Sequence, residues 1–596
     1  MSFPSFLSFL FIILMVKRAA KLSSFDFRSS LVTAFLFLGF AAIIWRLFSL
    51  QILHGKDARL QADAQHSIYK KLFPSRGEIK LADQFSSATI PVATNVKSFL
   101  VYASPPDIVS PAATAFSLAK ALQLDPKDVL EKITRANTRY VPLKKALSDA
   151  EQEKIKNLKL SGIFLDSEDT RVYPENNLLS QAVGYVGFKD QSSKKVGLYG
   201  LEKYFEKDLA GSQGELVAEK DTGGGVIFGA SNKGTPAVDG VDLILTIDKT
   251  LQFQAQSIIK DSVVKNGADG GCIILTDPKT GAVLAMANYP DFNPNEYNKV
   301  TNPKDFQNMA TLGNYEPGSV FKAITMAAAL DKEKVTPETT YNDAGVVEVD
   351  GYKIKNSDQK AHGVQNMIQV LDESLNTGAI FAKEQIGNDD FYSYLQKFGF
   401  GGATGIELPE GKGNLDGLKA KIKVDYDTAS FGQGISVTPL QLVRAYIALA
   451  NQGKMMKPYI VQSKIYPDGK VQNTLPKESG QVISTKAANT LSAMLVSVIE
   501  NGHGKKAGVP GYYLAGKTGT AQVPKKGGGY EENNNIGTFV GFGPVEDPKF
   551  VMLVRVDHPR DVTFAESTAA PAWGKMAQFI LNYYHIAPTR EINPPK

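Results

Sequence analysis

The 596-residue sequence predicts an α+β protein with an N-terminal transmembrane helix, a mixed α/β domain, and a larger domain whose antiparallel sheet is flanked by helices. Three observations lead to this prediction. An uncharged apolar run lies near the N-terminus, and a glycine-rich passage over residues 221–240 separates two regions of the chain. In the second region, strand-like runs cluster at both ends with helical patterns between them. That order favours an antiparallel sheet with an inserted helical lobe over an alternating parallel α/β fold.

The apolar run is interpreted as a membrane anchor. Ser29 to Trp45 carry no charge, and as a helix they rise about 26 Å, close to the thickness of a hydrocarbon core. No small-residue cleavage site follows, so we expect an uncleaved anchor over residues 29–50. The basic residues just before it are Lys17, Arg18, Lys21 and Arg28. They place residues 1–28 in the cytoplasm and the domains outside, because positive charge stays on the cytoplasmic side. Met15 offers an alternative start, so the first fourteen residues are interpreted as an over-extended start.

The two domains are expected over residues 51–240 and 241–596. The first combines short strands with amphipathic helices at 111–122 and 149–158, the latter opened by the capping pair Ser148 and Glu151. The second begins with an alternating strand at 241–248 and a helix at 249–265, followed by a strand pair that turns at 277–281. Late strands are expected at 511–514, 537–543 and 550–557, and a glycine- and asparagine-rich mobile loop at 525–535.

The composition excludes several kinds of protein. The net charge of +5 is small and forms no basic stripe, so nucleic acid is not an expected partner. The single cysteine, Cys272, rules out an intramolecular disulfide and lies in an apolar run typical of a buried strand. The six histidines show no zinc-ligand spacing and give a serine–histidine triad no local support. No metal and no organic cofactor are therefore expected.

The first chemical candidate is Ser319. Glu316-Pro317-Gly318 precedes it and a helix-forming run follows Lys322, so we expect Ser319 in the first turn of a helix with Lys322 on the same face. A lysine one turn away accepts the hydroxyl proton if burial lowers its pKa, and a helix N-terminus favours the developing negative charge. Ser-x-x-Lys alone is a weak signal, because the spacing also occurs at Ser67, Ser117, Ser192, Ser257, Ser262 and Ser357.

Two further motifs distinguish Ser319 from these repeats. Ser374-Leu375-Asn376 follows 55 residues later, in an expected loop-like break over residues 373–378, where a hydroxyl could relay protons and an amide could hold a substrate carbonyl. A helix cap is the alternative for this motif. Lys517-Thr518-Gly519-Thr520 follows after another 143 residues, behind an expected strand. Its lysine would form a cationic wall suited to a carboxylate-ended substrate, and Gly519 would let substrate backbone approach closely.

These three motifs, in this order, resemble the active-site motifs of penicillin-binding proteins and serine β-lactamases. Other segments resemble the class B transpeptidases, and the resemblance covers nearly the whole chain after residue 30. Those segments are Arg76–Ile79, Arg171–Pro174, Gly200–Glu202, Leu245–Asp248, Pro290–Asn295 and Phe431–Gly434. One element departs from the family: residues 80–85 read Lys-Leu-Ala-Asp-Gln-Phe where the family has Asp-Arg-Asn-Gly, which puts contacts of the first domain with partners in doubt.

The resemblance implies a serine D,D-transpeptidase that cross-links peptidoglycan stem peptides and is inhibited by β-lactams. Residues 51–240 would be a pedestal or dimerisation-type domain and residues 241–596 the penicillin-binding transpeptidase domain. Ser319 would be acylated with Lys322 as base, Ser374 and Asn376 would complete the proton and substrate network, and the backbone N–H groups of Ser319 and Thr520 would form the oxyanion hole. The substrate-binding residues would be Lys517, Thr518, Gly519 and Thr520.

The resemblance also implies partners and leaves alternatives open. A membrane glycosyltransferase polymerase and division proteins are expected partners, since the chain resembles no polymerase itself. Asn376-Thr377-Gly378-Ala379 and the sequence around Lys517 resemble the division-septum enzymes more than the elongation enzymes. An elongation-type transpeptidase, a D,D-carboxypeptidase or other hydrolase, and a non-catalytic penicillin-binding scaffold are the alternatives.

Overall fold

The structure is a computed structural model that describes residues 24–56, 67–82, 88–136, 138, 140–189, 195–219, 233–525, 527, 529–562 and 564–591. The chain forms two compact units, Met1–Phe73 with Gln213–Ala237, and Pro74–Ser212 with Val238–Lys596. The predictions for the basic N-terminus and its start, for the glycine-rich residues 220–232 and for residues 83–85 lie outside the described residues.

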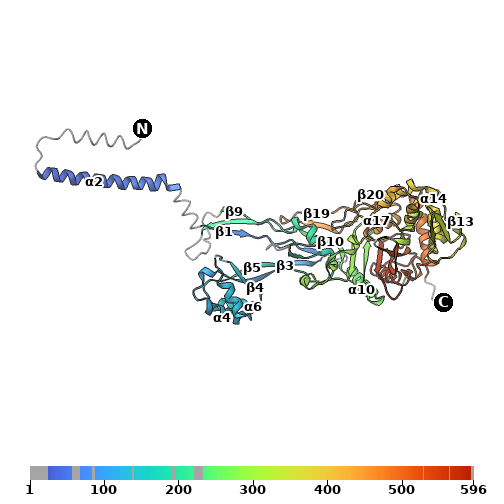
Figure 1. The fold of residues 1–596 in the computed structure, drawn as a ribbon, viewed down its shortest axis with the longest axis horizontal. Coiled ribbons are helices and arrows are strands. Elements are labelled where there is room, and N and C mark those ends of the chain that lie inside the picture. Colours follow the sequence, from blue (N-terminus) through green and yellow to red (C-terminus); the bar gives the residue numbers. More distant parts are fainter. Residues whose placement is uncertain are drawn as a thin grey trace, which may run out of the picture. The chain divides into compact units, whose positions relative to one another are not determined.

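The first unit contains the predicted apolar helix. Helix α2 (Ser24–Phe48) continues as a π-helical turn, η1 (Ser49–Leu53), and Arg28–Leu53 is apolar and long enough to cross a membrane (Figure 1). None of this span is buried against the rest of the chain, which a core helix would be. The same unit holds an antiparallel sheet of β1 (Ser67–Leu72), β8 (Gly214–Glu219) and β9 (Lys233–Thr235).

The second unit begins with a small α/β layer. Strands β3 (Thr89–Ala103), β4 (Val141–Leu147) and β5 (Ile163–Val172) are covered by α4 (Pro111–Leu122), α5 (Pro126–Ile133) and α6 (Asp149–Leu158). The core between them is apolar, with Leu118 and Val101 fully buried. Helices α4 and α6 have the predicted bounds, and the capping box of Ser148 and Glu151 is present. Local periodicity and capping therefore decided these elements.

A longer sheet combines strands from both sides of the predicted domain boundary at residue 240. Its order is β19 (Val471–Asn473), β18 (Val461–Ile465), β10 (Asp242–Asp248), β2 (Ile79–Ala82), β3 and β4, with β5 paired to β3. Strand β10 pairs in parallel with β2 and antiparallel with β18. Strand β10 thus shares backbone hydrogen bonds with segments on both sides of the predicted domain boundary, which stays a prediction.

Three of the family-like segments meet beside this sheet. Glu202, fully buried, accepts hydrogen bonds from Arg76 Nε at 2.7 Å and from Arg171 Nε at 2.8 Å. Tyr173 OH lies 3.3 Å from the same carboxylate. Two guanidinium groups therefore compensate one buried charge and join segments that are far apart in the sequence.

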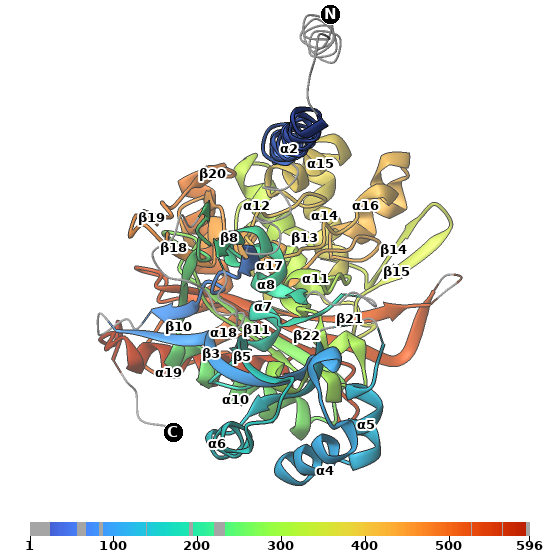
Figure 2. The ribbon, with the colours of Figure 1, turned by 90° about the vertical axis from the view of Figure 1, so that its left-hand side faces the viewer.

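A five-stranded sheet in the last part of the chain is fully antiparallel and lies near the predicted motifs. Its order is β12 (Val283–Tyr289), β11 (Gly270–Thr276), β23 (Phe550–Asp557), β22 (Tyr530–Gly543) and β21 (Ala515–Pro524). Alternation along β11 sends Ile273 to one face, where it packs with residues of α10 (Lys249–Lys265) and α19 (Ala569–Tyr583), and Cys272 to the other. That second face packs against α17 (Pro439–Ala450) and α18 (Thr485–Glu500). The ribbons of β11, α10 and α19 can be followed in Figure 2. The predicted flanked antiparallel sheet is confirmed.

The inserted lobe lies between α12 (Lys322–Asp331) and α17 in the sequence. It contains the strand pair β13 (Thr340–Asp343) and β16 (Gly363–Asn366) and the hairpin β14 (Val346–Val349) and β15 (Tyr352–Lys355). Its helices are α13 (Met367–Asp372), α14 (Asn376–Ile386), α15 (Asn388–Lys397) and α16 (Lys423–Ala429). Shorter elements elsewhere are α7 (Ser180–Val183), β6 (Val186–Phe188), β7 (Lys195–Gly197), α8 (Gly200–Tyr204), α9 (Glu206–Leu209), α11 (Met309–Leu312), β17 (Lys454–Met456) and β20 (Glu478–Gln481).

Two predictions in the last part of the chain are wrong, one of a strand and one of a loop. Residues 511–514 form a turn and loop, and β21 begins at Ala515, so Lys517–Thr520 lies within the strand instead of after it. The predicted loop 525–535 is strand from Tyr530 onward, because β22 pairs with β21 as far as Tyr530 opposite Pro524. Backbone pairing along the edge of the sheet outweighs the low strand propensity of glycine and asparagine here.

Candidate active site

The structure brings the three predicted motifs together. Ser374 Oγ accepts a hydrogen bond from Lys322 Nζ at 3.2 Å and one from Lys517 Nζ at 3.0 Å, although these lysines lie 52 and 143 residues away in the sequence. Lys322 Nζ also donates to the Ser374 carbonyl oxygen. One hydroxyl therefore links both motif lysines.

Ser319 lies in a short 3₁₀ turn, η5 (Gly318–Phe321), that leads directly into α12. Ser319 thus lies in the turn that opens the helix, as predicted, and Lys322 is the first residue of α12. Ser319 is half-buried, and its hydroxyl makes no hydrogen bond to any residue that the structure describes. A partly exposed, uncommitted hydroxyl at the start of a helix is available to a substrate.

Strand β21 passes this turn closely. A Cβ atom on Gly519 would lie 2.9 Å from the Val320 nitrogen and 3.0 Å from the Pro317 carbonyl oxygen. Only glycine allows this approach, because contacts under 3.0 Å displace the neighbouring backbone. The Lys517–Thr520 segment is thereby held beside the turn that carries Ser319.

Ser374 occupies the break between α13 and α14. Its φ of +56° is left-handed, which a residue with a Cβ atom adopts at a cost of roughly 1–2 kcal/mol. The turn points the side chain inward, leaving Ser374 only 9% exposed. The predicted break over residues 373–378 is too long, because only residues 373–375 lie between the two helices and Asn376 is already the first residue of α14. The helix starts here because Asn356 Oδ1 accepts the first backbone N–H groups of α14, which no local pattern shows.

The two lysines differ from ordinary surface lysines in their electrostatics. Lys322 is 1% exposed and Lys517 is 0% exposed. Burial, and secondarily the charge of Lys517, holds the pKa of Lys322 well below its usual value. Burial lowers the pKa of Lys517 to about 7, against the opposing effect of the Asp372 carboxylate. A lysine that is neutral near neutral pH has a lone pair that accepts a proton.

The remaining predicted residues lie around this centre. Asn376 Nδ2 donates to the Lys355 carbonyl oxygen at 2.8 Å, so this amide holds the β15 end of the hairpin. Thr520 Oγ1 accepts the N–H of Ala565 at 3.0 Å. Thr518 Oγ1 lies 3.4 Å from Lys517 Nζ. Among the described residues the amide oxygen of Asn376 has no hydrogen-bond partner, and each threonine hydroxyl oxygen has a second lone pair.

Sequence reasoning missed several contributors. Glu316, three residues before Ser319, accepts hydrogen bonds from Tyr530 OH at 3.0 Å and from the Gly434 N–H at 3.1 Å, and burial raises its pKa. It ties the nucleophile turn to β22 and to the family-like Phe431–Gly434 segment. Asp372 is buried beside Ser374 and accepts from Ser497 Oγ at 2.8 Å. In the sequence, only the closeness of Glu316 to Ser319 and of Asp372 to Ser374 could have indicated that these carboxylates belong to the site.

Metal and thiol chemistry have no support in the described part of the chain. Over the described residues, no group of three or more His, Cys, Asp or Glu side chains could hold a metal ion. Cys272 is fully buried on β11, and burial raises the pKa of its thiol to about 12, so it is an inert small apolar side chain.

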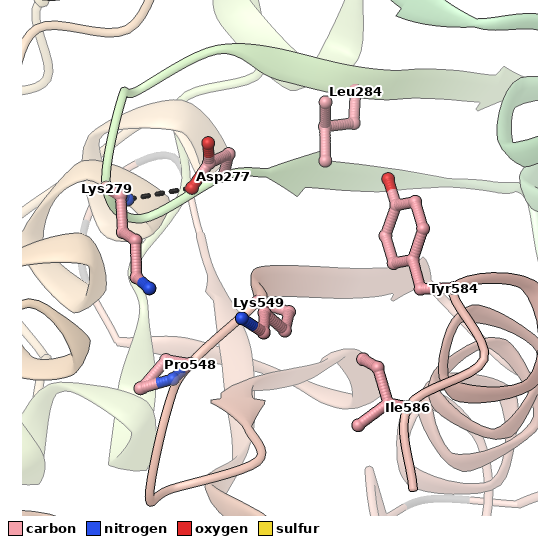
Figure 3. Close-up of a pocket in the computed structure, with 7 residues that line it drawn as sticks. All are labelled: Asp277, Lys279, Leu284, Pro548, Lys549, Tyr584 and Ile586. Carbon is pink, nitrogen blue, oxygen red and sulfur yellow. Dashed lines mark hydrogen bonds between the residues drawn. The ribbon is translucent and has the colours of Figure 1, made fainter. Parts of the chain in front are cut away.

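A hollow of about 350 Å³ lies away from the motifs. It is lined by the β11–β12 turn, the segment before β23 and the residues after α19, including Lys279, Lys549 and Tyr584 (Figure 3). Lys279 N donates to Asp277 Oδ1 at 2.8 Å, which is an ordinary turn contact. None of the motif residues lines this hollow, so it adds nothing to the proposed chemistry.

Comparison with known proteins identifies the arrangement. The family described as penicillin binding protein transpeptidase domain matches residues 271–578, and the penicillin-binding protein dimerisation domain matches residues 71–245. The chain belongs to the penicillin-binding protein family. The predicted family and the prediction of a transpeptidase enzyme are confirmed.

Two named relatives of this penicillin-binding protein match nearly all of its length. Stage V sporulation protein D of Bacillus subtilis is 34% identical over 96% of this chain and 88% of its own length. Peptidoglycan D,D-transpeptidase FtsI of Escherichia coli K12 is 29% identical over 96% of this chain and 94% of its own.

Solved structures have the same fold. Penicillin binding protein 2X of Streptococcus thermophilus matches with a TM-score of 0.72 at 24% identity, over 86% of this chain and 80% of its own. Penicillin binding protein 3 of Mycobacterium tuberculosis, complexed with aztreonam, matches with a TM-score of 0.67 at 25% identity, over 88% and 99%. The predicted fold class, a penicillin-binding transpeptidase domain behind a mixed α/β domain, is confirmed.

Proposed function

We propose that this penicillin-binding protein is a membrane-anchored peptidoglycan D,D-transpeptidase that forms an acyl-enzyme on Ser319. The observation that carries the proposal is the position of Ser374 Oγ between two buried lysines, 3.2 Å from Lys322 Nζ and 3.0 Å from Lys517 Nζ, at the motif serine of the family. Relatives across the full chain are named peptidoglycan D,D-transpeptidases.

In the first half-reaction, Ser319 Oγ attacks the carbonyl carbon of the penultimate D-alanine of a donor stem peptide. Lys322 accepts the hydroxyl proton, because burial lowers the pKa of its amine. The backbone N–H groups of Ser319 and Thr520 stabilise the oxyanion. The C–N bond then breaks, and the terminal D-alanine leaves with a proton delivered through Ser374 Oγ.

In the second half-reaction, an acceptor amine attacks the Ser319 ester and gives one proton to the Lys322–Ser374 pair. A new amide bond forms, the C–O bond to Ser319 breaks, and the pair passes that proton to Ser319 Oγ. Lys517, Thr518 and Thr520 bind the terminal carboxylate of the donor, Gly519 admits its backbone, and Asn376 holds a donor carbonyl. β-Lactams would enter the same half-reaction as carboxylate-bearing acyl donors.

The cellular setting is proposed from the anchor and the resemblance. The apolar span Arg28–Leu53 would hold the enzyme in the cytoplasmic membrane as a single pass, with both domains on the extracytoplasmic side. Residues 51–240 would be the pedestal, residues 241–596 the catalytic domain, and the activity would serve septal wall synthesis beside a membrane polymerase and division proteins. Deleting residues 1–55 should move the chain from the membrane to the soluble fraction.

Intact-mass spectrometry tests the acyl-enzyme. We expect the purified ectodomain to gain one β-lactam mass, Ser319→Ala to gain none, and Ser257→Ala to behave like the wild type. Ser257 is a matched control because it also precedes a lysine by three residues but is exposed on α10. Absence of an adduct on the wild type would contradict the proposal, and rapid loss of the adduct in water would favour a hydrolase.

A further inference from the structure

Helix α14, which carries Asn376, has no N-terminal cap of its own. Its N-cap residue, Leu375, has no side-chain acceptor for the first backbone N–H groups. Asn356 Oδ1 accepts these instead, from Asn376 N at 2.9 Å and from Thr377 N at 3.3 Å. A side chain twenty residues upstream thus performs the capping role that the sequence around Ser374 lacks.

The orientation of the Asn356 amide is fixed on both sides. Its Nδ2 donates to Asp343 Oδ2 at 2.8 Å and to the Lys360 carbonyl oxygen at 3.1 Å. Rotating the amide by half a turn would set donors against donors at α14 and an oxygen against two acceptors at the other end. Asn356 is only 3% exposed, so water cannot replace these partners.

Asp343 holds Asn356 in place. It is 1% exposed and accepts hydrogen bonds from Gly345 N at 2.9 Å, His362 N at 3.0 Å and Thr377 Oγ1 at 2.8 Å. Neutral donors therefore surround this buried carboxylate. The network joins β13 and the segment after β15 to the first turn of α14.

This network bears directly on Ser374. The left-handed turn at Ser374 is confined between the end of α13 and the start of α14. Only Leu375 separates it from the two backbone N–H groups that Asn356 holds. Asn376 Nδ2 donates to the Lys355 carbonyl oxygen at 2.8 Å. Lys355 and Asn356, which are consecutive, therefore both accept hydrogen bonds from the first turn of α14.

We propose that Asn356, oriented by Asp343, is a positioning residue for acylation that keeps Ser374 Oγ between Lys322 and Lys517. The inference rests on the proposed acyl-enzyme on Ser319 and adds residues outside the three family motifs. Asn356 acts through Ser374 and makes no contact with the reacting atoms. Loss of the cap would leave both lysines in place but misdirect the hydroxyl that connects them.

The test compares Asn356→Ala, Asn356→Asp and the double variant Asp343→Asn/Asn356→Asp with the wild type. The readouts are the rate constant of acylation by a fluorescent penicillin between pH 5 and 9, the melting temperature, and hydrogen exchange at Asn376 and Thr377. We expect Asn356→Ala to slow acylation at least tenfold, to shift the acid limb of the pH profile and to expose both amides. Asn356→Asp keeps a capping oxygen but faces the Asp343 carboxylate, and the double variant restores one donor–acceptor pair and should recover part of the rate.

Ser148→Ala is the matched control, because it removes an N-cap of α6 in the first domain, far from Ser374 in the fold. It should lower the melting temperature without slowing acylation. The inference would be overturned if Asn356→Ala kept the wild-type acylation rate and pH profile while its melting temperature fell as much as that of Ser148→Ala. It would also be overturned if the double variant were acylated no faster than Asn356→Asp. Failure of the wild type to acylate would instead overturn the proposed function.

Discussion

Lys517 Nζ lies 3.0 Å from Ser374 Oγ, the oxygen that Lys322 Nζ reaches at 3.2 Å. A hydroxyl oxygen accepts two hydrogen bonds and donates one, so Ser374 can pass a proton between the lysines and the substrate. Five predictions depend on this contact and on the turns that hold it.

Removing the bridging hydroxyl should damage acylation without unfolding the protein. We expect Ser374→Ala to slow β-lactam acylation by about 10²–10⁴, the range for loss of acid–base assistance. Stopped-flow fluorescence measures this rate. Ser492→Ala is a suitable control, since Ser492 is also buried but bonds only to its own helix on α18. Equal rates in both variants would contradict the relay.

The pH profile of acylation should be a bell. Below its depressed pKa, Lys322 is protonated and cannot accept a proton, which gives the acid limb. Above about 7, Lys517 loses the charge that attracts a carboxylate, which gives the alkaline limb. Because the two amines share one oxygen, the limbs report pKa values of the pair.

Asp372 sets the position of the alkaline limb. Its charge raises the pKa of Lys517, so Asp372→Asn should move this limb to lower pH. The neighbouring Glu373 is exposed, and Glu373→Gln should leave the limb in place because solvent screens its charge. A limb that stays near 7 in Asp372→Asn would contradict the assignment to Lys517.

The buried Lys517 should lower stability at neutral pH. The unfolded lysine binds a proton up to its ordinary pKa near 10.5, whereas the folded one does so only up to about 7. Between these values the unfolded state holds more protons, so the free energy of unfolding rises with pH by about 1.4 kcal/mol per unit from this group. Lys517→Met should therefore be inactive but more stable at pH 7, and its stability should rise less from pH 7 to 9. Urea denaturation at both pH values measures this, and a less stable variant would contradict it.

Gly432 packs against Gly318 in the turn that carries Ser319, and its carbonyl oxygen accepts the Gly318 N–H at 3.0 Å. It has a φ of +82°, and a Cβ atom there would lie 2.3 Å from the Gly318 carbonyl oxygen. Gly432→Ala should slow acylation more than tenfold and lower the melting temperature. Gly469 has a φ of +83° with open space around it, so Gly469→Ala carries the same backbone strain without the clash. Similar acylation rates in the two variants would show that the clash does not reach Ser319.

Local patterns predicted many elements because they depend on nearby residues. The bounds of α10 follow from apolar periodicity ended at Lys265, and Asp248 caps it by accepting from Leu251 N. Strand β11 with Cys272 and the turn before β12 follow from an apolar run and turn residues. The late strands were placed less well, because β21 and β22 owe their extent to pairing with each other.

The sequence by itself determined the apolar span, the order of the three motifs and the family they indicate. Those features reside in residue types and short spacings, which folding does not alter. Only the tertiary structure decided that Ser374 faces both lysines, that Asn356 caps α14 and that Glu316 meets Tyr530. These contacts join residues between 20 and 214 positions apart. The direction of each side chain is set by a backbone turn and by packing from distant segments, and neither is encoded in a local pattern.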